Sequence, residues 1–516
     1  MRLSTLLLGV SLIAVAVPAA AQTAPVTSAT DSSAAATTTL RDALIQAYNT
    51  NPDLAGERAN LRATDENVPI ARASGLPGVN STGSVSQGLT NSNSSTITGQ
   101  PNRQGNLGID LSVPVFSGGA VRNSVRAAET RVDAGRSVLR GAEADVFTQV
   151  VTVYLNVILN EEIVRLNQQN VHALDVNLQA TRDRFEVGDL TRTDVAQSEA
   201  RAALAQSQLR QAEARLIGAR EDYIRVVGSP PGVLAAPPAL PGLPGDVGTA
   251  EQTALDNNPN LEAAQKAGDA TKFDIDVARA SRLPKVSVGV GGSYYDYLGS
   301  VQGQSGLNTN GFSTTAGVQL SLPLFQGGRP AAQIRQAQAR RSAALENVTL
   351  VERGVVAQAR SAFANYQSSL RVIESSKVAV DANRLSLEGV RAENSVGTRT
   401  ILDILNAEQE LLNSQVNYVT AERDAYVAGF QLLAAMGRAE ARDLNLDGGP
   451  LYDPGVNYKR VKNRWSDRND DPEPEAVGTR TTGTRPQTPD VTSTALDPVL
   501  QRNDATRPVD INRKKP

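Results

Sequence analysis

Cysteine is absent from this 516-residue chain, and His172 is its one histidine. The lack of cysteine excludes disulfides, thiolate metal sites and cysteine nucleophiles. A single histidine argues against a Ser-His-Asp triad and against a metal site built from several histidines. Aromatic residues make up only 4% of the chain and the formal net charge is −3, so no nucleic-acid partner is indicated. We therefore expect a protein that is not an enzyme and that carries no cofactor.

Long apolar runs are also missing after the first residues. Arg2 is followed by LLLGVSLIAVAV, and Ala19 and Ala21 precede a cleavage site, which is typical of a secretory signal peptide. No cysteine follows that site, so a lipoprotein anchor is not expected. Beyond residue 21 no run of ~18 apolar residues predicts a spanning helix. An exported chain of this kind would enter a membrane through β-strands.

The chain reads as two copies of one unit. LSVPVFSGG from Leu111 recurs as LSLPLFQGG from Leu320, 209 residues later, and Asn51-Pro52 recurs as Asn258-Pro259. Four further positions keep the offset of 209: Gly188, Thr191, Asp194 and Glu199 match Gly397, Thr400, Asp403 and Glu408. A constant offset through different kinds of pattern predicts a duplication.

Each copy is predicted to contain a helix, two strands, a long helix, a turn and a second helix. Helices are expected near residues 40–74 and 250–281, which are rich in alanine and carry apolar residues at three and four spacing. The prolines that follow end these helices, because the residue before a proline is pushed out of the α region. Alternating apolar residues predict strands at 79–89, 106–115, 286–291 and 317–324, with loops at 90–105 and 297–312. After each glycine pair, a helical pattern persists for about 67 residues, or ~100 Å. The second helices carry heptads with one apolar and one small column.

The predicted domain boundaries follow these patterns. They are a signal peptide (1–21), a flexible N-terminus (22–39), a first repeat (40–228), a proline-rich linker (229–250), a second repeat (251–437), a segment packed on the helical body (438–466) and a disordered tail (467–516).

Four strands of this length can cross a bilayer but cannot close a barrel, and open edges in lipid are costly. Several chains sharing one barrel would remove those edges. Phe116 and Phe325 at one end, with Tyr294, Tyr295 and Tyr297 at the other, are predicted to lie at the membrane interfaces. An ordinary half-buried antiparallel sheet would show the same alternation, so that alternative stays open.

The order of elements, the PVFSGG and PLFQGG turns, and the motifs VGDLTRTDV and VGTRTILDILNAE resemble the TolC family of outer-membrane efflux proteins over about residues 40–465. The resemblance implies a mixed fold, in which a membrane β-barrel of 12 strands, shared by a homotrimer, continues into a long α-helical coiled-coil barrel. It implies a passive exit duct in the outer membrane that extends into the periplasm and serves tripartite efflux or type I secretion. The implied partners are a periplasmic adaptor (membrane fusion protein), an inner-membrane RND or ABC transporter, and outer-membrane lipid, with no nucleic acid.

Three sets of residues are candidates for function. The barrel-to-helix turns are Pro114, Gly118, Gly119, Pro323, Gly327 and Gly328. The helix-turn tips are Gly188, Thr191, Gly397 and Thr400, where glycine allows a tight reversal and threonine caps the returning helix. The resemblance implies that an adaptor docks there. It also implies a gate at Asp194, Arg399, Asp403 and Asn406, in which Arg399 binds Asp194 and Asp403 forms an acidic ring.

Two positions depart from the family's gate. Asn394 replaces a tyrosine, and Asn406 replaces an aspartate of a second ring. The alternative function is a soluble periplasmic coiled-coil adaptor or scaffold, which would not need two amphipathic strand hairpins.

Overall fold

The computed structural model describes residues 37–87, 103–298, 310–444, 446 and 451–491. The predicted signal peptide, most of the two predicted strand loops, and residues 492–516 lie outside the described residues. The structure below is that of the body that begins at Thr37.

A four-stranded antiparallel sheet joins the two repeats. Its strands are β2 (Gly78–Gln87), β3 (Arg103–Phe116), β5 (Lys285–Tyr297) and β6 (Asn310–Ser321), in the spatial order β2-β3-β5-β6. Each repeat supplies one hairpin, and β3 pairs with β5 to connect the hairpins. Strands are confirmed at the four predicted places. β6 ends at Ser321 rather than continuing to residue 324, and residues 88–89 of the first predicted strand lie outside the described residues.

Helices of 7 to 22 residues precede each hairpin, and an asparagine-proline pair separates the first helix of each group from the second. The first group is α1 (Leu40–Thr50), α2 (Pro52–Asp65) and α3 (Asn67–Ala73), and the second is α6 (Val247–Asn257) and α7 (Pro259–Ala280). The side chain of Asn51 accepts hydrogen bonds from the backbone amides of Asp53 and Leu54, and Asn258 caps α7 in the same way. The helices were predicted near these positions, but the breaks were missed.

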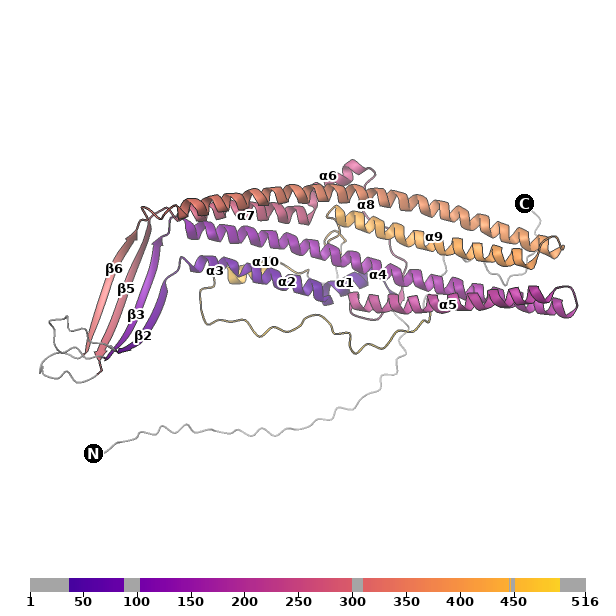
Figure 1. The fold of residues 1–516 in the computed structure, drawn as a ribbon, viewed down its shortest axis with the longest axis horizontal. Helices are drawn as coiled ribbons and strands as arrows, with labels where there is room; N and C mark the ends of the chain where they lie inside the picture. Colours follow the sequence, from indigo (N-terminus) through magenta and orange to yellow (C-terminus); the bar gives the residue numbers. More distant parts are fainter. Residues whose placement is uncertain (1–36, 88–102, 299–309, 445, 447–450, 492–516) are drawn as a thin grey trace, which may run out of the picture. The chain divides into compact units, whose positions relative to one another are not determined.

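Long helices follow each hairpin. α4 (Ala120–Glu186) and α8 (Arg329–Ser395) each contain 67 residues, as the helical pattern predicted. They return as α5 (Arg192–Val227) and α9 (Ile401–Ala435), and the short α10 (Gly455–Val461) comes later in the chain. Within this body the sheet lies at one end of the long helices, and the α4–α5 and α8–α9 turns lie at the other (Figure 1).

The main hydrophobic core lies where α1, α4, α5 and α9 meet. Its largest buried side chains include Phe147, Tyr154, Tyr223 and Phe430. The Tyr154 hydroxyl lies 2.6 Å from the carbonyl oxygen of Ala235 and 3.0 Å from that of Thr38. These contacts anchor a second, two-stranded sheet made by β1 (Thr37–Thr38) and β4 (Val233–Leu234). The end of the predicted flexible N-terminus and part of the predicted linker are therefore ordered by pairing with each other.

One described helix, α4, contains an 18-residue window with a mean hydropathy of 1.3, enough by length and composition to cross a bilayer. The window is not an unbroken apolar run, since polar residues such as Gln149 and Asn156 interrupt it, and the sequence prediction of no spanning helix after residue 21 stays a prediction. Half of the window is buried inside the protein. Burial of this kind is expected of a core helix, whose apolar side chains face neighbouring helices.

The predicted disordered tail begins differently from expectation. Residues 467–491 run without a helix along the first repeat, and Val491 packs against the main core. Arg220 of α5 donates to the carbonyl oxygens of Thr488 and Asp490, each at 2.7 Å. Disorder was predicted because this segment is polar and cannot form a core of its own. The prediction was wrong up to residue 491, since side chains of α5 satisfy the backbone of the segment.

Candidate functional site

The turn between α4 and α5 is a tight reversal closed by a capping box. Gly188 has a φ of 84°, a left-handed conformation that favours glycine, and its amide donates to the carbonyl oxygen of Phe185 at 3.0 Å. The Thr191 hydroxyl accepts from the Asp194 amide at 3.3 Å, and the Asp194 carboxylate accepts from the Thr191 amide at 2.9 Å. The predicted capping role of Thr191 is confirmed.

The turn between α8 and α9 repeats this arrangement 209 residues later. Gly397 has a φ of 83°, and Thr400 forms a capping box with Asp403. The Thr400 amide donates to the Asp403 carboxylate at 3.0 Å, and the threonine hydroxyl lies 2.8 Å from the same oxygen. Val187 and Val396, just before the two glycines, are about three-quarters exposed. Each tip therefore presents an apolar side chain beside an ordered helix start.

The two capping carboxylates stay charged. Hydrogen bonds from the side chain and then the backbone of Thr191 lower the pKa of Asp194 below its ordinary value of 3.8. Thr400 lowers the pKa of Asp403 in the same way, and the positive charge of Arg399 adds to the effect. Both residues are partly exposed, so each tip presents a negatively charged carboxylate at neutral pH.

The gate implied by the family resemblance is not formed as a contact within the chain. Arg399 pairs with Glu393 at 2.7 Å, whereas Asp194 is held by Thr191. Glu393 lies six residues before Arg399 on the same tip, and the Arg399–Asp194 link stays a prediction. Asn406 accepts a hydrogen bond from Arg201 of α5 at 2.8 Å and so links the two repeats.

The barrel-to-helix turns have the geometry that their glycines predicted. Gly118 and Gly119 have φ values of 63° and 82°, and Gly327 and Gly328 have 59° and 82°. At Gly118 a Cβ would lie 2.7 Å from the Cβ of Leu283, so only glycine fits this close approach. Pro114 lies at a β-bulge, where the pairing of β3 with β5 shifts before Phe116. Pro323 lies just after the end of β6.

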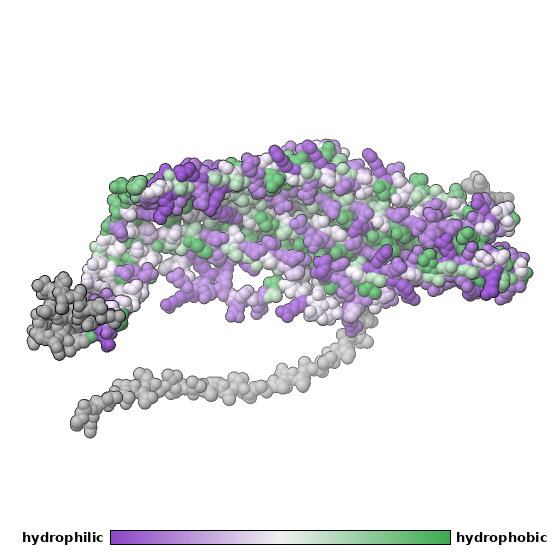
Figure 2. All heavy atoms as spheres, in the orientation of Figure 1, coloured by the Kyte–Doolittle hydropathy of each residue, from purple (hydrophilic) through white to green (hydrophobic). Residues whose placement is uncertain are grey.

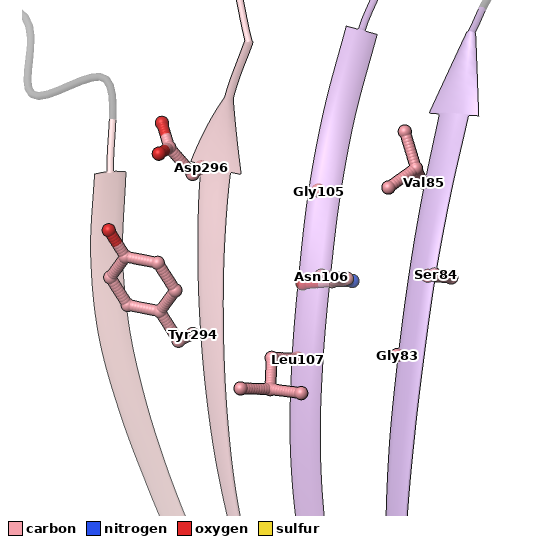
Figure 3. A pocket seen from close by; sticks show the side chains of 8 residues that line it. All are labelled: Gly83, Ser84, Val85, Gly105, Asn106, Leu107, Tyr294 and Asp296. Carbon is pink, nitrogen blue, oxygen red and sulfur yellow. The ribbon is translucent and has the colours of Figure 1, made fainter. Parts of the chain in front are cut away.

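The sheet has one apolar and one polar face. Leu107, Ile109 and Leu111 of β3 lie opposite Tyr294, Gly292 and Val290 of β5 on the apolar face. On this face the glycines Gly83 and Gly105 leave a hollow of about 310 Å³ beside Leu107 and Tyr294 (Figure 3). The surface over the strands is mostly white and green, whereas the helices carry much purple (Figure 2).

The register of β5 corrects the prediction that Tyr294, Tyr295 and Tyr297 all face a membrane interface. Tyr294 lies on the apolar face, but Tyr295 and Tyr297 alternate to the polar face, opposite Asn106 and Gln104. The rings of Tyr295 and Tyr297 contact each other edge to face, with centroids 5.6 Å apart. Two of the three tyrosines therefore cannot point to lipid in the way that Tyr294 does.

Three buried charged residues, at two places in the fold, were missed by the sequence reasoning. Arg220 and Glu161 form an ion pair of 2.6 Å between α5 and α4. Glu408 of α9 accepts from Asn177 of α4 at 2.7 Å and from Arg391 of α8 at 2.9 Å. The repeat offset gave a signal for Glu408, because it aligns Arg391 and Glu408 with Arg182 and Glu199. The offset does not say which of these two ion pairs is buried.

Comparison with known families now adds to this geometry. The family model described as "Outer membrane efflux protein" matches residues 43–229 and 251–438, more than half of the chain. The chain belongs to this family. The outer membrane efflux protein BepC of Brucella suis is 34% identical over 433 residues, which cover 84% of this chain and 92% of that protein. The outer membrane protein TolC of Escherichia coli is 28% identical, covering 62% and 66%.

A solved structure supports the same fold for this efflux protein. The CmeC outer membrane channel of Campylobacter jejuni aligns with a TM-score of 0.68 at 17% identity, covering 82% of this chain and 89% of that chain. The resemblance to outer-membrane channels predicted from the motifs is thus confirmed. This efflux protein is a channel of the outer membrane that acts in efflux or type I secretion. Members of the family are channel proteins rather than enzymes, and the family match favours this function over a soluble adaptor.

Proposed function

We propose that this efflux protein works as a homotrimer, in which three sheets close one barrel and three sets of long helices form a passive duct through the periplasm. The observation that carries the proposal is the sheet itself: in the described residues β2 and β6 are edge strands, and four strands cannot close a barrel. An unpaired edge in lipid leaves backbone groups without partners, at a cost of several kcal/mol each. Pairing β6 of one chain with β2 of the next removes every such edge, while the apolar face contacts outer-membrane lipid.

The surface of α8 supports the same assembly. Only five of its 67 residues are buried in a single chain. Several large apolar side chains along it are exposed, namely Leu345, Leu350, Leu370, Val378 and Leu385. A neighbouring chain packed along α8 would remove this apolar surface from water.

The proposed docking site for a periplasmic adaptor is the pair of tips around Gly188, Thr191, Gly397 and Thr400. Exposed Val187 and Val396 supply apolar contacts there. An inner-membrane RND or ABC transporter would complete the system. BepC is named as an efflux protein and AprF of Pseudomonas aeruginosa as an alkaline protease secretion protein, and the two names support the two kinds of export.

The proposed gate uses symmetry rather than a contact within one chain. A three-fold axis brings three copies of Asp403 together and focuses negative potential at the opening. Asn406 adds no charge, so this field is weaker than that of a double acidic ring. Replacing Arg399 removes its ion pair with Glu393, which braces the turn, but leaves the capping box of Thr400 and Asp403 in place.

Two measurements test this function. The detergent-solubilised protein should have three times the 54.5 kDa mass of the chain in light scattering, less its leader and after subtraction of detergent, and should form channels in planar bilayers. Arg399→Ser should raise the single-channel conductance, whereas Asp403→Ala should mainly reduce block by divalent cations. A monomer that forms no channel would contradict the proposal.

A further inference from the structure

The hollow on the apolar face lies near the outer end of the sheet, the end where β2 stops and β3 begins, away from the long helices (Figure 1, Figure 3). Leu107 of β3 and Tyr294 of β5 pair with each other on its helix side. Val85, Gly105 and Asp296 form the next row of paired residues toward the outer end. Its volume of about 310 Å³ is at the lower limit of small-molecule sites, which measure ~300–1,000 Å³. The hollow is therefore large enough for part of a ligand.

Two of the residues that line the hollow, Gly83 and Gly105, are glycines that the backbone does not require. Neither has a left-handed φ. A Cβ at Gly105 would lie 3.7 Å from the carbonyl oxygen of Asp296, and a Cβ at Gly83 would lie 3.8 Å from Cδ1 of Leu107, which are ordinary contact distances. Glycine weakens the interior of a strand and often marks a place where a ligand approaches the backbone closely. The missing side chains therefore indicate a ligand rather than a constraint of the sheet.

The chemical character of the surface changes from one side of the hollow to the other. On the helix side, Leu107 and Phe312 are exposed apolar residues in the same row. At the outer end, the guanidinium of Arg103 donates to the side chain of Gln87 at 3.1 Å. The carboxylate of Asp296 lines the hollow, and within the described structure it accepts no hydrogen bond and forms no ion pair. A positive charge and a free acceptor thus lie next to an apolar surface, which suits an anionic lipid whose headgroup also carries hydrogen-bond donors.

We propose that this hollow binds one lipopolysaccharide molecule of the outer membrane. An acyl chain fills the space over Gly83 and Gly105, and a phosphate of the headgroup binds Arg103 through charge-assisted hydrogen bonds. Asp296 accepts a hydrogen bond from a hydroxyl or amide group of the sugar.

The inference rests on the proposed function, in which the apolar face contacts outer-membrane lipid and the long helices extend into the periplasm. The outer end of the sheet then lies in the outer leaflet, whose anionic lipid is lipopolysaccharide. Pairing of β6 with β2 of the next chain joins edge strands and leaves this face of the sheet open to lipid.

Native mass spectrometry of the detergent-purified protein tests the binding, with Re lipopolysaccharide and phosphatidylglycerol as the two probes. The wild type should retain several-fold more lipopolysaccharide than phosphatidylglycerol. Gly105→Val fills the hollow where a Cβ meets only ordinary contacts, so it should retain several-fold less lipopolysaccharide than the wild type. Gly317→Val is the matched control, because it adds the same side chain on the polar face, where no atom lies within 4 Å of the Cβ. Equal retention by Gly105→Val and wild type, or equal retention of both lipids by the wild type, would overturn the proposal.

The same spectra separate this inference from the proposed function, since they give the mass of the oligomer directly. A monomer that retains lipopolysaccharide would contradict the trimer and support the site, whereas a trimer that retains none would overturn the site alone. If Gly105→Val does not fold, Arg103→Gln decides, because it changes an exposed side chain and leaves the hollow unfilled. Retained lipopolysaccharide should fall several-fold in Arg103→Gln, and an unchanged amount would overturn the proposal.

Photo-crosslinking in cells tests the leaflet. Val85 beside the hollow and Val318 near the helix end of the same face are 74% and 71% exposed, so the two positions are matched in accessibility. With p-benzoylphenylalanine in place of Val85 we expect a crosslink to lipopolysaccharide, and with it in place of Val318 we expect crosslinks to phospholipid. Lipopolysaccharide crosslinked at neither position, or equally at both, would overturn the proposal.

Discussion

Arg220 and Glu161 are 6% and 2% exposed at their side chains, which makes their ion pair one of the most buried polar contacts in the described chain. Two buried charges lose their hydration, and the loss is offset only when both are well hydrogen-bonded. Arg220 meets this condition because it also donates to two backbone carbonyls of the tail. A single residue thus joins α4, α5 and the C-terminal segment.

Arg220→Met should therefore lower the free energy of unfolding by about 3–5 kcal/mol, since it leaves the carboxylate of Glu161 buried with a lost partner. Arg225→Met is the matched control, because its pair with Asp222 at 3.4 Å is mostly exposed. The control should cost no more than about 1 kcal/mol. Denaturant unfolding followed by circular dichroism measures both, and equal losses would contradict the prediction.

Glycines that share a left-handed φ differ in what surrounds them. Gly437 has a φ of 69°, and a Cβ there would lie 2.3 Å from the carbonyl oxygen of Asn257. Gly188 has no neighbour within 4 Å of a Cβ. Gly188→Ala should cost about 1–2 kcal/mol from the left-handed backbone alone. Gly437→Ala should cost clearly more, because the backbone near Asn257 must also move; thermal unfolding that ranks the two in the opposite order would refute this.

At the scale of elements, the helix starts at the tips depend on ionised carboxylates. The pKa values of Asp194 and Asp403 lie below the ordinary 3.8, so their stabilising effect is fully present above about pH 4. It is lost as the pH falls through the lowered values. The first turns of α5 and α9 should consequently fray in strong acid before the core does.

Thr191→Ala should weaken the start of α5 by about 1 kcal/mol, the usual cost of losing an N-cap. Amide hydrogen exchange at the first turn of α5 should become faster and should lose much of its dependence on pH below 4. The first turn of α9, capped by Thr400, serves as an internal control and should not change. Faster exchange at both turns would indicate a general loss of structure instead.

At the scale of the whole molecule, the segment that follows each repeat covers the other repeat. The linker after the first repeat places Leu240 at Gly429 of α9, where a Cβ would lie 2.7 Å from the leucine Cδ1. The tail after the second repeat binds Arg220 of α5, which lies 209 positions before Gly429. The two repeats are therefore fastened at equivalent places by segments outside the family match.

Deletion of residues 467–516 should leave a folded channel with a lower unfolding temperature, because the carbonyl partners of Arg220 and the packing of Val491 are removed. Deletion of residues 492–516 alone keeps every described contact and is the control. Thermal unfolding of both truncated proteins measures the difference. Equal unfolding temperatures would show that the tail does not stabilise the body.

Much of this protein was determined by local sequence patterns. Alternation predicted four strands, the offset of 209 predicted a duplication, and glycine with threonine predicted the tips, since backbone geometry at these places depends on residues close in the chain. The position of Tyr295 and Tyr297 was predicted incorrectly, because the register, set by pairing with another strand, decides on which face of the sheet each tyrosine lies.

Only the tertiary structure decided which charges are buried and where polar segments go. Nothing near Glu408 in sequence distinguishes it from Glu199, and its burial depends on α4, more than 200 residues earlier. The tail to residue 491 is ordered for a similar reason: its backbone groups bond to Arg220, about 270 residues away. Contacts between distant segments depend on packing, which a pattern of neighbouring residues does not contain.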